Sequence, residues 1–402
     1  MLRIGQFARL SMMRWGCVCA ALLGGMARAE AQPKPAVSPS ETRFTERSPA
    51  SAKVQPVSGA AVVGAKSGCT PRDYFIVSSR HCSRVECANG DLNCLRYYHS
   101  THDGCLTSID RPSFFNAIDP NRPVCFVIHG SYHTWDDARS ESQLVNAWLC
   151  AAAPDSPVQL VFYTWPSGKR YPFFVQLELA TYGRRSSLHS LFLARVVAAL
   201  PREQKVCIMG HSHGARMASA AAHLLGGGEI ENGDALPQGT CAPDHIRLVL
   251  LAPAIDHHWL NPGERYGQAM FPTERLMLVR NSKDFTLGAY RLRKPFAPRA
   301  LGRNGFGSDD LAALGELAGR IVDMDVVNLL GYRHPLRDYY GCGQLAKEVV
   351  PCAFFGDDAA TTVSRLDSDE LSTHIEQTTL RVNRRFECDS SRESEWQPRG
   401  KR

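Results

Sequence analysis

The chain has 402 residues, 44% of them hydrophobic and 21% charged, which is typical of a globular protein with one large domain or two smaller ones. Its formal net charge of +6 falls to 6 − 4 = +2 without the four arginines of residues 1–29, a stretch that has no acidic residue. So small a surplus excludes an electrostatic case for nucleic acid or an anionic membrane as a partner.

The first 29 residues predict a secretory signal peptide. Arg9 and Arg14 precede the apolar stretch Trp15–Ala27, which is too short to span a bilayer, and Ala27-Arg28-Ala29 places small residues at the cleavage positions. An uncleaved anchor is the alternative. No later segment is apolar for long enough to cross a membrane. We therefore expect an exported protein (periplasmic, cell-surface or extracellular) that has no transmembrane segment once the signal is removed.

The rest of the chain divides into a linker, a domain and a tail. Residues 30–68 are rich in Pro, Ser, Ala and Thr and predict a disordered linker, whereas residues 356–402 are polar and predict a loose C-terminal tail. Between them, residues 69–355 are expected to form one α/β domain. Apolar runs predict strands at Tyr74–Val77, Leu95–His99, Pro123–Ile128, Val158–Thr164, Val206–Met209, Ile246–Ala252, Leu276–Arg280 and Ile321–Val327. Helical spacing is found at Glu141–Ala151, Ser187–Leu200, Ala215–Leu225 and Leu311–Ala318. This alternation predicts a mostly parallel sheet with helices on both faces.

The cysteine content agrees with export. Disulfides are expected because an exported protein meets an oxidising compartment, and the candidates are Cys82, Cys87, Cys94, Cys105, Cys342 and Cys352. A zinc site is the competing interpretation, but the spacings do not match a paired C-x-x-C pattern. Cys125 and Cys207 lie inside apolar strands and are predicted to be buried thiols.

The strongest chemical signal follows the strand Val206–Met209. There Gly210-His211-Ser212-His213-Gly214 joins an apolar strand to a helix of small residues. A serine nucleophile on such a sharp turn needs glycines two positions before and two after it, because the backbone approaches neighbouring chain too closely for side chains. The pattern alone is weak, and its position between strand and helix gives it weight. We predict that Ser212 is a nucleophile.

A second turn follows the strand Pro123–Ile128 and reads His129-Gly130-Ser131-Tyr132. In a parallel sheet the carboxyl ends of strands share one edge, so this turn is expected near Ser212. We predict that the backbone N–H groups of Ser131 and His213 form an oxyanion hole, with Tyr132 as the alternative to Ser131.

With these motifs the chain resembles the alpha/beta-hydrolase superfamily, and more closely a bacterial family of uncharacterised, exported hydrolase-like proteins. The matching segments are Phe75–Arg80, Val124–Trp135, Val161–Tyr171, Val206–Met217, Leu248–Asp256, Leu276–Leu287 and Gly331–Tyr340. Trp-Pro-Ser after one strand and Ala-Pro-x-x-Asp after another are the more distinguishing of these features. That family usually has a methionine-like residue after the serine, where this chain has His213.

The resemblance implies a Ser, acid, His order along the chain. Asp284 follows the strand Leu276–Arg280 and stands at the usual acid position, while Asp256, at the end of the preceding strand, is the alternative. His334 and His374 are the histidines after Asp284, and His334 is the predicted base because it follows the last strand by a short loop. His211 and His213 are expected to pack or to line the pocket.

These residues predict a serine hydrolase that acts on an ester through an acyl-enzyme and needs no cofactor or metal. The expected partner is a small-molecule or acyl-ester substrate, with Tyr171, Phe173 and Phe174 as possible lining of an apolar pocket. A lipase, thioesterase, peptidase or acyltransferase with the same triad is an alternative. So is a non-catalytic exported binding protein on a hydrolase scaffold.

Overall fold

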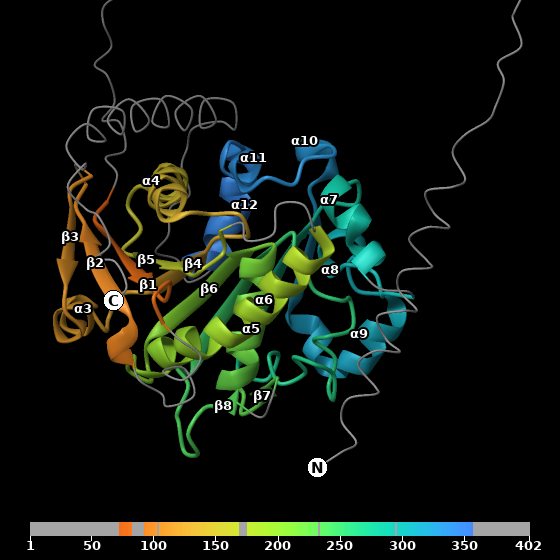
Figure 1. Cartoon of the computed structure of the whole chain (residues 1–402), viewed down its shortest axis with the longest axis horizontal. Coiled ribbons are helices and arrows are strands. Elements are labelled where there is room, and N and C mark those ends of the chain that lie inside the picture. The colour runs from red at the N-terminus through yellow and green to blue at the C-terminus, as the bar shows by residue number, and fades with distance from the viewer. Residues whose placement is uncertain are drawn as a thin grey trace, which may run out of the picture. The chain divides into compact units, whose positions relative to one another are not determined.

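A nine-stranded sheet lies at the centre of the fold, in the order β11-β10-β9-β6-β4-β5-β1-β2-β3 (Figure 1). Its parallel strands are β1 (Tyr74–Ser78), β4 (Val124–Ile128), β5 (Gln159–Thr164), β6 (Lys205–His211), β9 (His245–Leu251), β10 (Thr273–Arg280) and β11 (Ile321–Asp325). Two antiparallel strands, β2 (Arg96–Ser100) and β3 (Leu106–Ile109), complete one edge. A separate small hairpin joins β7 (Glu229–Ile230) to β8 (Asp234–Ala235).

The computed structural model describes residues 72–82, 92–102, 104–168, 175–231, 234–293 and 296–356. All of these belong to the compact unit Ala65–Arg402. The predicted signal peptide, the linker, Tyr171, Phe173, Phe174, His374 and all but the first residue of the predicted tail lie outside the described residues. The domain boundaries at 29, 68 and 355 therefore remain predictions.

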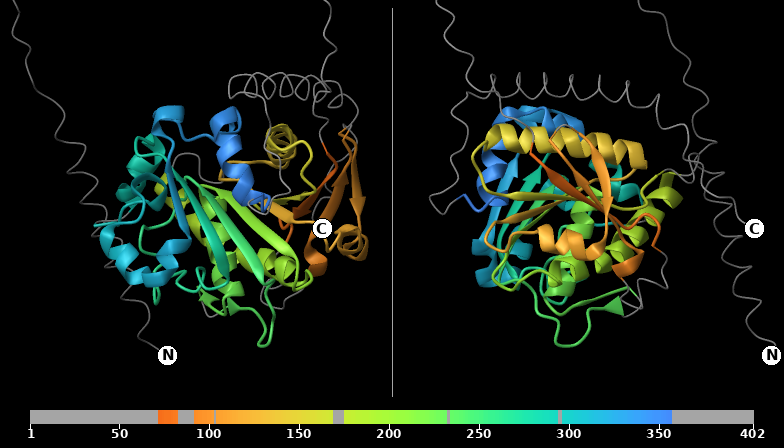
Figure 2. Two further views of the ribbon diagram at one scale, coloured as in Figure 1. Left: turned by 180° about the vertical axis from the view of Figure 1, so that it is seen from behind. Right: turned by 90° about the vertical axis from the view of Figure 1, so that its left-hand side faces the viewer.

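Helices cover both faces of the sheet, as the rear and side views in Figure 2 show. On one face lie α3 (Arg111–Ala117), α5 (Val175–Ala198) and α6 (His213–Leu225). On the other face lie α4 (Trp135–Ala152), α11 (Leu336–Tyr340) and α12 (Gly343–Ala353). Shorter helices fill the connections: η1 (Leu92–Cys94), α7 (Phe285–Gly288), η2 (Ala289–Arg293), α8 (Leu301–Asn304), α9 (Ser308–Leu314), η3 (Gly315–Arg320) and α10 (Val327–Leu330).

Side chains alternate between two hydrophobic cores along each central strand. In β4, Val124, Phe126 and Ile128 enter the core under α5 and α6, whereas Cys125 and Val127 enter the core under α4 and α12. Every residue of β4 is buried, which explains why this strand is almost continuously apolar. Both faces of the sheet are therefore covered by hydrophobic cores, and the loops at the carboxyl ends of the strands are where polar side chains can gather.

Each predicted strand and helix corresponds to an observed element, with different ends. Helix α4 begins earlier than expected, at Trp135, because Thr134 and Asp137 form a capping box before the apolar spacing starts. Helix α5 also starts earlier, at Val175, and the predicted helix Leu311–Ala318 is divided between α9 and η3. β3, α3, α11, α12, the β7–β8 hairpin and the short connecting helices η1, α7, η2, α8 and α10 were not predicted from the sequence.

The cysteine predictions can be followed within the described residues. Cys82 and Cys94 form a disulfide. Cys125 and Cys207 are paired in register on β4 and β6 as buried thiols, as predicted. None of the described helices combines the length and the apolar character needed to cross a bilayer.

Candidate active site

Ser212 stands on the turn between β6 and α6 with a backbone φ of 53° and ψ of −115°, a conformation that side-chain-bearing residues rarely adopt. The flanking glycines are required by close approach. A Cβ on Gly210 would lie 2.3 Å from the Gly214 carbonyl oxygen, and a Cβ on Gly214 would lie 2.4 Å from the Ile128 carbonyl oxygen. The turn therefore has the tight packing that the glycine spacing predicted.

Three of the predicted residues meet in one hydrogen-bonded line. The Ser212 Oγ lies 3.2 Å from His334 Nε2, and His334 Nδ1 lies 2.6 Å from Asp284 Oδ2. Asp284 is fully buried, and its other oxygen accepts a 2.8 Å bond from the Leu287 N–H as the N-cap of α7. That bond fixes the carboxylate, so Asp284 can fix the imidazole in turn.

The structure places the alternative acid elsewhere. Asp256 Oδ1 accepts a 2.8 Å bond from the Tyr290 hydroxyl and pairs with Arg293. The histidine after it, His257, bonds Asp310 at 2.6 Å. Among the residues that the structure describes, no three histidines, cysteines or carboxylates converge as a metal ion would require.

The turn after β4 lies beside Ser212. A Cβ on Gly130 would be 3.5 Å from the Ser212 Cβ. The Tyr132 N–H already donates a 2.8 Å bond to the Ser167 carbonyl, which leaves Ser131 as the better of the two predicted donors. The N–H of His213 belongs to the first residue of α6, where no preceding turn supplies an intrahelical acceptor. The side chains of these two residues are hydrogen-bonded to each other, because Ser131 Oγ lies 2.9 Å from His213 Nδ1.

The two histidines that flank Ser212 do not contact its hydroxyl but hold the surrounding loops. His211 Nε2 donates a 2.9 Å bond to the backbone carbonyl of His334. Burial lowers the pKa of His211 well below the ordinary value and that of His213 to about 3, so both rings are neutral at working pH. The sequence predicted that these rings pack or line the pocket, but it did not indicate their partners.

Arg80 was not among the predicted site residues, although it ties the loop after β4 to the end of β5. Its guanidinium donates to the carbonyls of His133 at 3.1 Å and Thr134 at 2.9 Å, and to the Thr164 hydroxyl at 2.7 Å. These partners lie 84, 53 and 54 positions away in the chain for Thr164, His133 and Thr134, so no local pattern could have indicated them.

A cavity of about 510 Å³ lies away from this site. Asp244, Pro272 and Glu274 line it at the start of β9 and β10, the edge of the sheet opposite to Ser212. Parallel sheets place their active sites at the carboxyl ends of the strands. We therefore place the candidate active site at Ser212 and not in this cavity.

The family described as "Alpha/beta hydrolase of unknown function (DUF900)" matches residues 114–287. The matched part runs from α3 to α7 and includes the His-Gly turn, Ser212 and Asp284, whereas His334 lies beyond it. No curated protein matches the chain in sequence.

Solved structures that match include two of esterase B from Lactobacillus rhamnosis and one of a lipase/esterase from Lactobacillus plantarum. An esterase B inhibited by a C6-C4 SN3 compound is 10% identical, with 80% of this chain and 90% of that chain covered and a TM-score of 0.30. Esterase B inhibited by a C4-C4 SN3 tributyrin phosphonate is 10% identical, with 80% and 89% covered and a TM-score of 0.31. The L. plantarum protein is 13% identical, with 57% and 83% covered and a TM-score of 0.25.

At TM-scores this low, the assignment rests on the family match and on the sheet itself. The parallel strands, the helices on both faces and the strained serine turn after β6 are the features that define this fold. The chain has the alpha/beta-hydrolase fold, and its residues 114–287 match a family of that fold.

Proposed function

We propose that the protein is a serine hydrolase that cleaves a carboxylic ester through an acyl-enzyme. The observation that carries the proposal is the line from Ser212 Oγ through His334 to Asp284, with separations of 3.2 and 2.6 Å. Both lie at or close to the 2.6–3.2 Å that proton transfer needs.

The roles follow from the geometry. His334 Nε2 takes the proton of Ser212 as the Oγ attacks the substrate carbonyl, and Asp284 stabilises the imidazolium that forms. The N–H groups of Ser131 and His213 then bind the oxyanion, helped by the N-terminal dipole of α6. Collapse of the tetrahedral intermediate expels the alcohol with the proton from His334. Water, activated by the same histidine, then releases the acid and restores Ser212.

An apolar acyl or aryl substituent suits the surface beside this triad. Phe285 follows the acid directly and its side chain is 80% exposed, while Tyr332, two positions before the base, is 68% exposed. The Phe285 N–H donates to the Tyr332 carbonyl at 3.2 Å, so the two aromatic residues lie on adjoining loops. Large exposed aromatic side chains beside a reactive group favour an apolar ligand.

Export remains part of the proposal. The disulfide between Cys82 and Cys94 is typical of proteins from oxidising compartments.

The test is labelling and turnover by Ser212. A fluorophosphonate should label the unaltered protein at Ser212, and Ser212→Ala should remove both the label and the hydrolysis of p-nitrophenyl acetate and butyrate, with a loss of roughly 10⁴-fold or more in kcat. Full activity of Ser212→Ala would contradict the proposal. Rates of hydrolysis measured side by side on ester, thioester and amide substrates distinguish an esterase from a thioesterase or a peptidase.

A further inference from the structure

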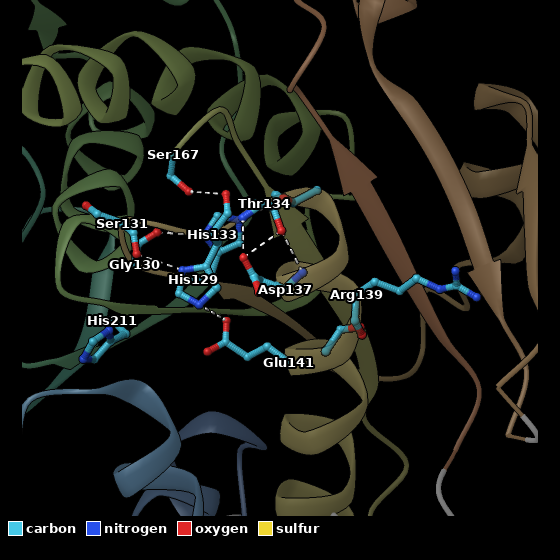
Figure 3. A network of polar contacts seen from close by, with 12 residues as sticks. His129, Gly130, Ser131, His133, Thr134, Asp137, Arg139, Glu141, Ser167 and His211 are labelled. Carbon is cyan, nitrogen blue, oxygen red and sulfur yellow. Dashed lines mark hydrogen bonds and ion pairs between the residues drawn. The ribbon is translucent and has the colours of Figure 1, made fainter. Parts of the chain in front are cut away.

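His133 follows the turn after β4 that carries Ser131, one of the two proposed oxyanion donors. Its ring lies between the Ser131 backbone carbonyl and the Glu141 carboxylate (Figure 3). Its Nδ1 donates a 2.9 Å bond to the Ser131 carbonyl, and its Nε2 lies 2.9 Å from Glu141 Oε2 on α4. Both partners can only accept hydrogen bonds. The imidazole can satisfy both only when each ring nitrogen carries a proton, which makes His133 an imidazolium.

The surroundings favour this charged form. The side chains of His133 and Glu141 are only 20% and 14% exposed, so their attraction is weakly screened. Burial alone lowers the pKa of His133, but the hydrogen bond and charge of Glu141, the Ser131 carbonyl and the charge of Asp137 outweigh burial and leave that pKa above its ordinary value. The other titratable or charged groups that face the ring are Arg80, which donates to the His133 carbonyl, and two neutral histidines, His129 at 4.8 Å between ring centroids and His211.

The peptide between Ser131 and Tyr132 is thereby held at both of its polar atoms. Its oxygen accepts from His133, and its N–H, that of Tyr132, donates to the Ser167 carbonyl at 2.8 Å. The Ser131 side chain is held separately by His213. The Ser131 N–H belongs to the preceding peptide, whose oxygen, that of Gly130, accepts a 2.8 Å bond from His129 Nδ1. The two peptide planes meet at the Ser131 Cα and turn relative to one another only through φ and ψ of Ser131, so holding the second plane limits the directions open to the Ser131 N–H.

We infer that His133, as an imidazolium paired with Glu141, is a positioning residue that orients the oxyanion-binding Ser131 N–H. This inference rests on the proposed function. When His133 loses a proton, one ring nitrogen presents a lone pair to an oxygen, and the Ser131 carbonyl or Glu141 is repelled. The charged form persists below the raised pKa of His133 and is lost above it. We therefore expect kcat to fall as the pH rises through that pKa, with KM nearly unchanged, because the oxyanion forms only after attack.

The experiment compares pH–rate profiles from about pH 5 to about pH 10, with Ser212→Ala as the blank for spontaneous ester hydrolysis. In the unaltered protein kcat should fall about tenfold or more on the alkaline side. Glu141→Gln should retain neutral activity without this fall, because its amide can donate to an unprotonated Nε2 while Nδ1–H stays on Ser131. Asp136→Asn, the same change of charge at an exposed position of α4, should keep the fall. His133→Ala should be about tenfold slower throughout, with KM within roughly twofold.

A second readout does not depend on activity. The His133 Cε1–H resonance, identified by its absence in His133→Ala, should titrate above the ordinary histidine range in the unaltered protein and at lower pH in Glu141→Gln. The inference is overturned if the alkaline fall is missing from the unaltered protein, or if it is equal in Glu141→Gln and Asp136→Asn. Failure of a fluorophosphonate to label Ser212 would instead overturn the proposed function, so the two failures are distinguishable.

Discussion

The histidines around Ser212 differ in what their ring nitrogens face. His334 faces a hydroxyl and a carboxylate, His211 a backbone carbonyl, and His213 the Ser131 hydroxyl. Only the first arrangement can take a proton from the nucleophile and leave the new charge compensated. The presence of a histidine near Ser212 therefore does not by itself reveal its role. The atom that each ring nitrogen faces decides whether we propose the ring as the catalytic base or as a residue that holds a loop in place.

At the same scale, the hydrogen bond between Ser131 and His213 is expected to matter for turnover. It joins the two residues whose N–H groups are proposed to bind the oxyanion, so losing it frees each donor to move relative to the other. Ser131→Ala and His213→Met each keep the backbone N–H and should lower kcat about threefold to tenfold, which corresponds to one hydrogen bond.

The double variant separates positioning from independent effects. If the two side chains act only through their mutual bond, Ser131→Ala combined with His213→Met should lose no more activity than the more impaired single variant. Steady-state kinetics on p-nitrophenyl butyrate measure this. Losses that multiply would show that the side chains act separately.

The sequence singled out three residues that meet in the structure, and each has a local pattern around it. Ser212 lies between Gly210 and Gly214, Asp284 follows β10 by four positions, and His334 follows β11 by nine. The supports had no such pattern: Glu141 reads as a surface position of an amphipathic helix, and Arg80 as a basic residue after β1. Their roles depend on contacts across different elements, which spacing along the chain does not encode.

At the scale of elements, the strand ends bring the site together. β4, β6, β10 and β11 are parallel neighbours or near neighbours in the sheet, so the loops at their carboxyl ends converge. The buried strands could be predicted because their central residues are mostly apolar. The helix α12 could not, since it has Pro351 inside it, a residue that ordinarily ends a helix.

The close packing of α6 against the end of β4 predicts the effect of a substitution at Gly214. A Cβ on Gly214 would lie 2.4 Å from the Ile128 carbonyl oxygen and 2.5 Å from that of His129, both backbone atoms that cannot turn away. Gly214→Ala should therefore push α6 from the strand, lower the free energy of unfolding by about 1–3 kcal/mol and slow labelling of Ser212. Gly319→Ala is the control, because a Cβ there meets nothing within 4 Å.

Urea unfolding measures the stability and timed fluorophosphonate labelling measures the nucleophile. The two should change together in Gly214→Ala and stay unchanged in Gly319→Ala. Normal labelling of an equally stable Gly214→Ala protein would mean that the helix can be displaced without disturbing Ser212, contrary to the packing described.

At the scale of the whole molecule, the site depends on segments far apart in the chain. Arg80, just after β1, holds the turn after β4, and His211 holds the loop of His334. Two residues beyond Arg80, Cys82 is bonded to Cys94, the last residue of η1 and two positions before β2. The disulfide thus closes the connection that leads away from β1, whose end supports the loop after β4 through Arg80.

Removing this disulfide should destabilise the fold more than it impairs the chemistry. Closing a loop with a sequence separation of 12 restricts the unfolded chain by about 3 kcal/mol, so Cys82→Ser with Cys94→Ser should lower the free energy of unfolding by roughly that amount. None of the proposed catalytic groups is bonded to either cysteine, so kcat at moderate temperature should stay within about twofold.

Urea unfolding with and without a reductant provides the comparison. The unaltered protein should lose stability when reduced and the double variant should not, because no bond is left to break. A reductant effect of equal size in both would assign the stabilisation to a different cysteine pair.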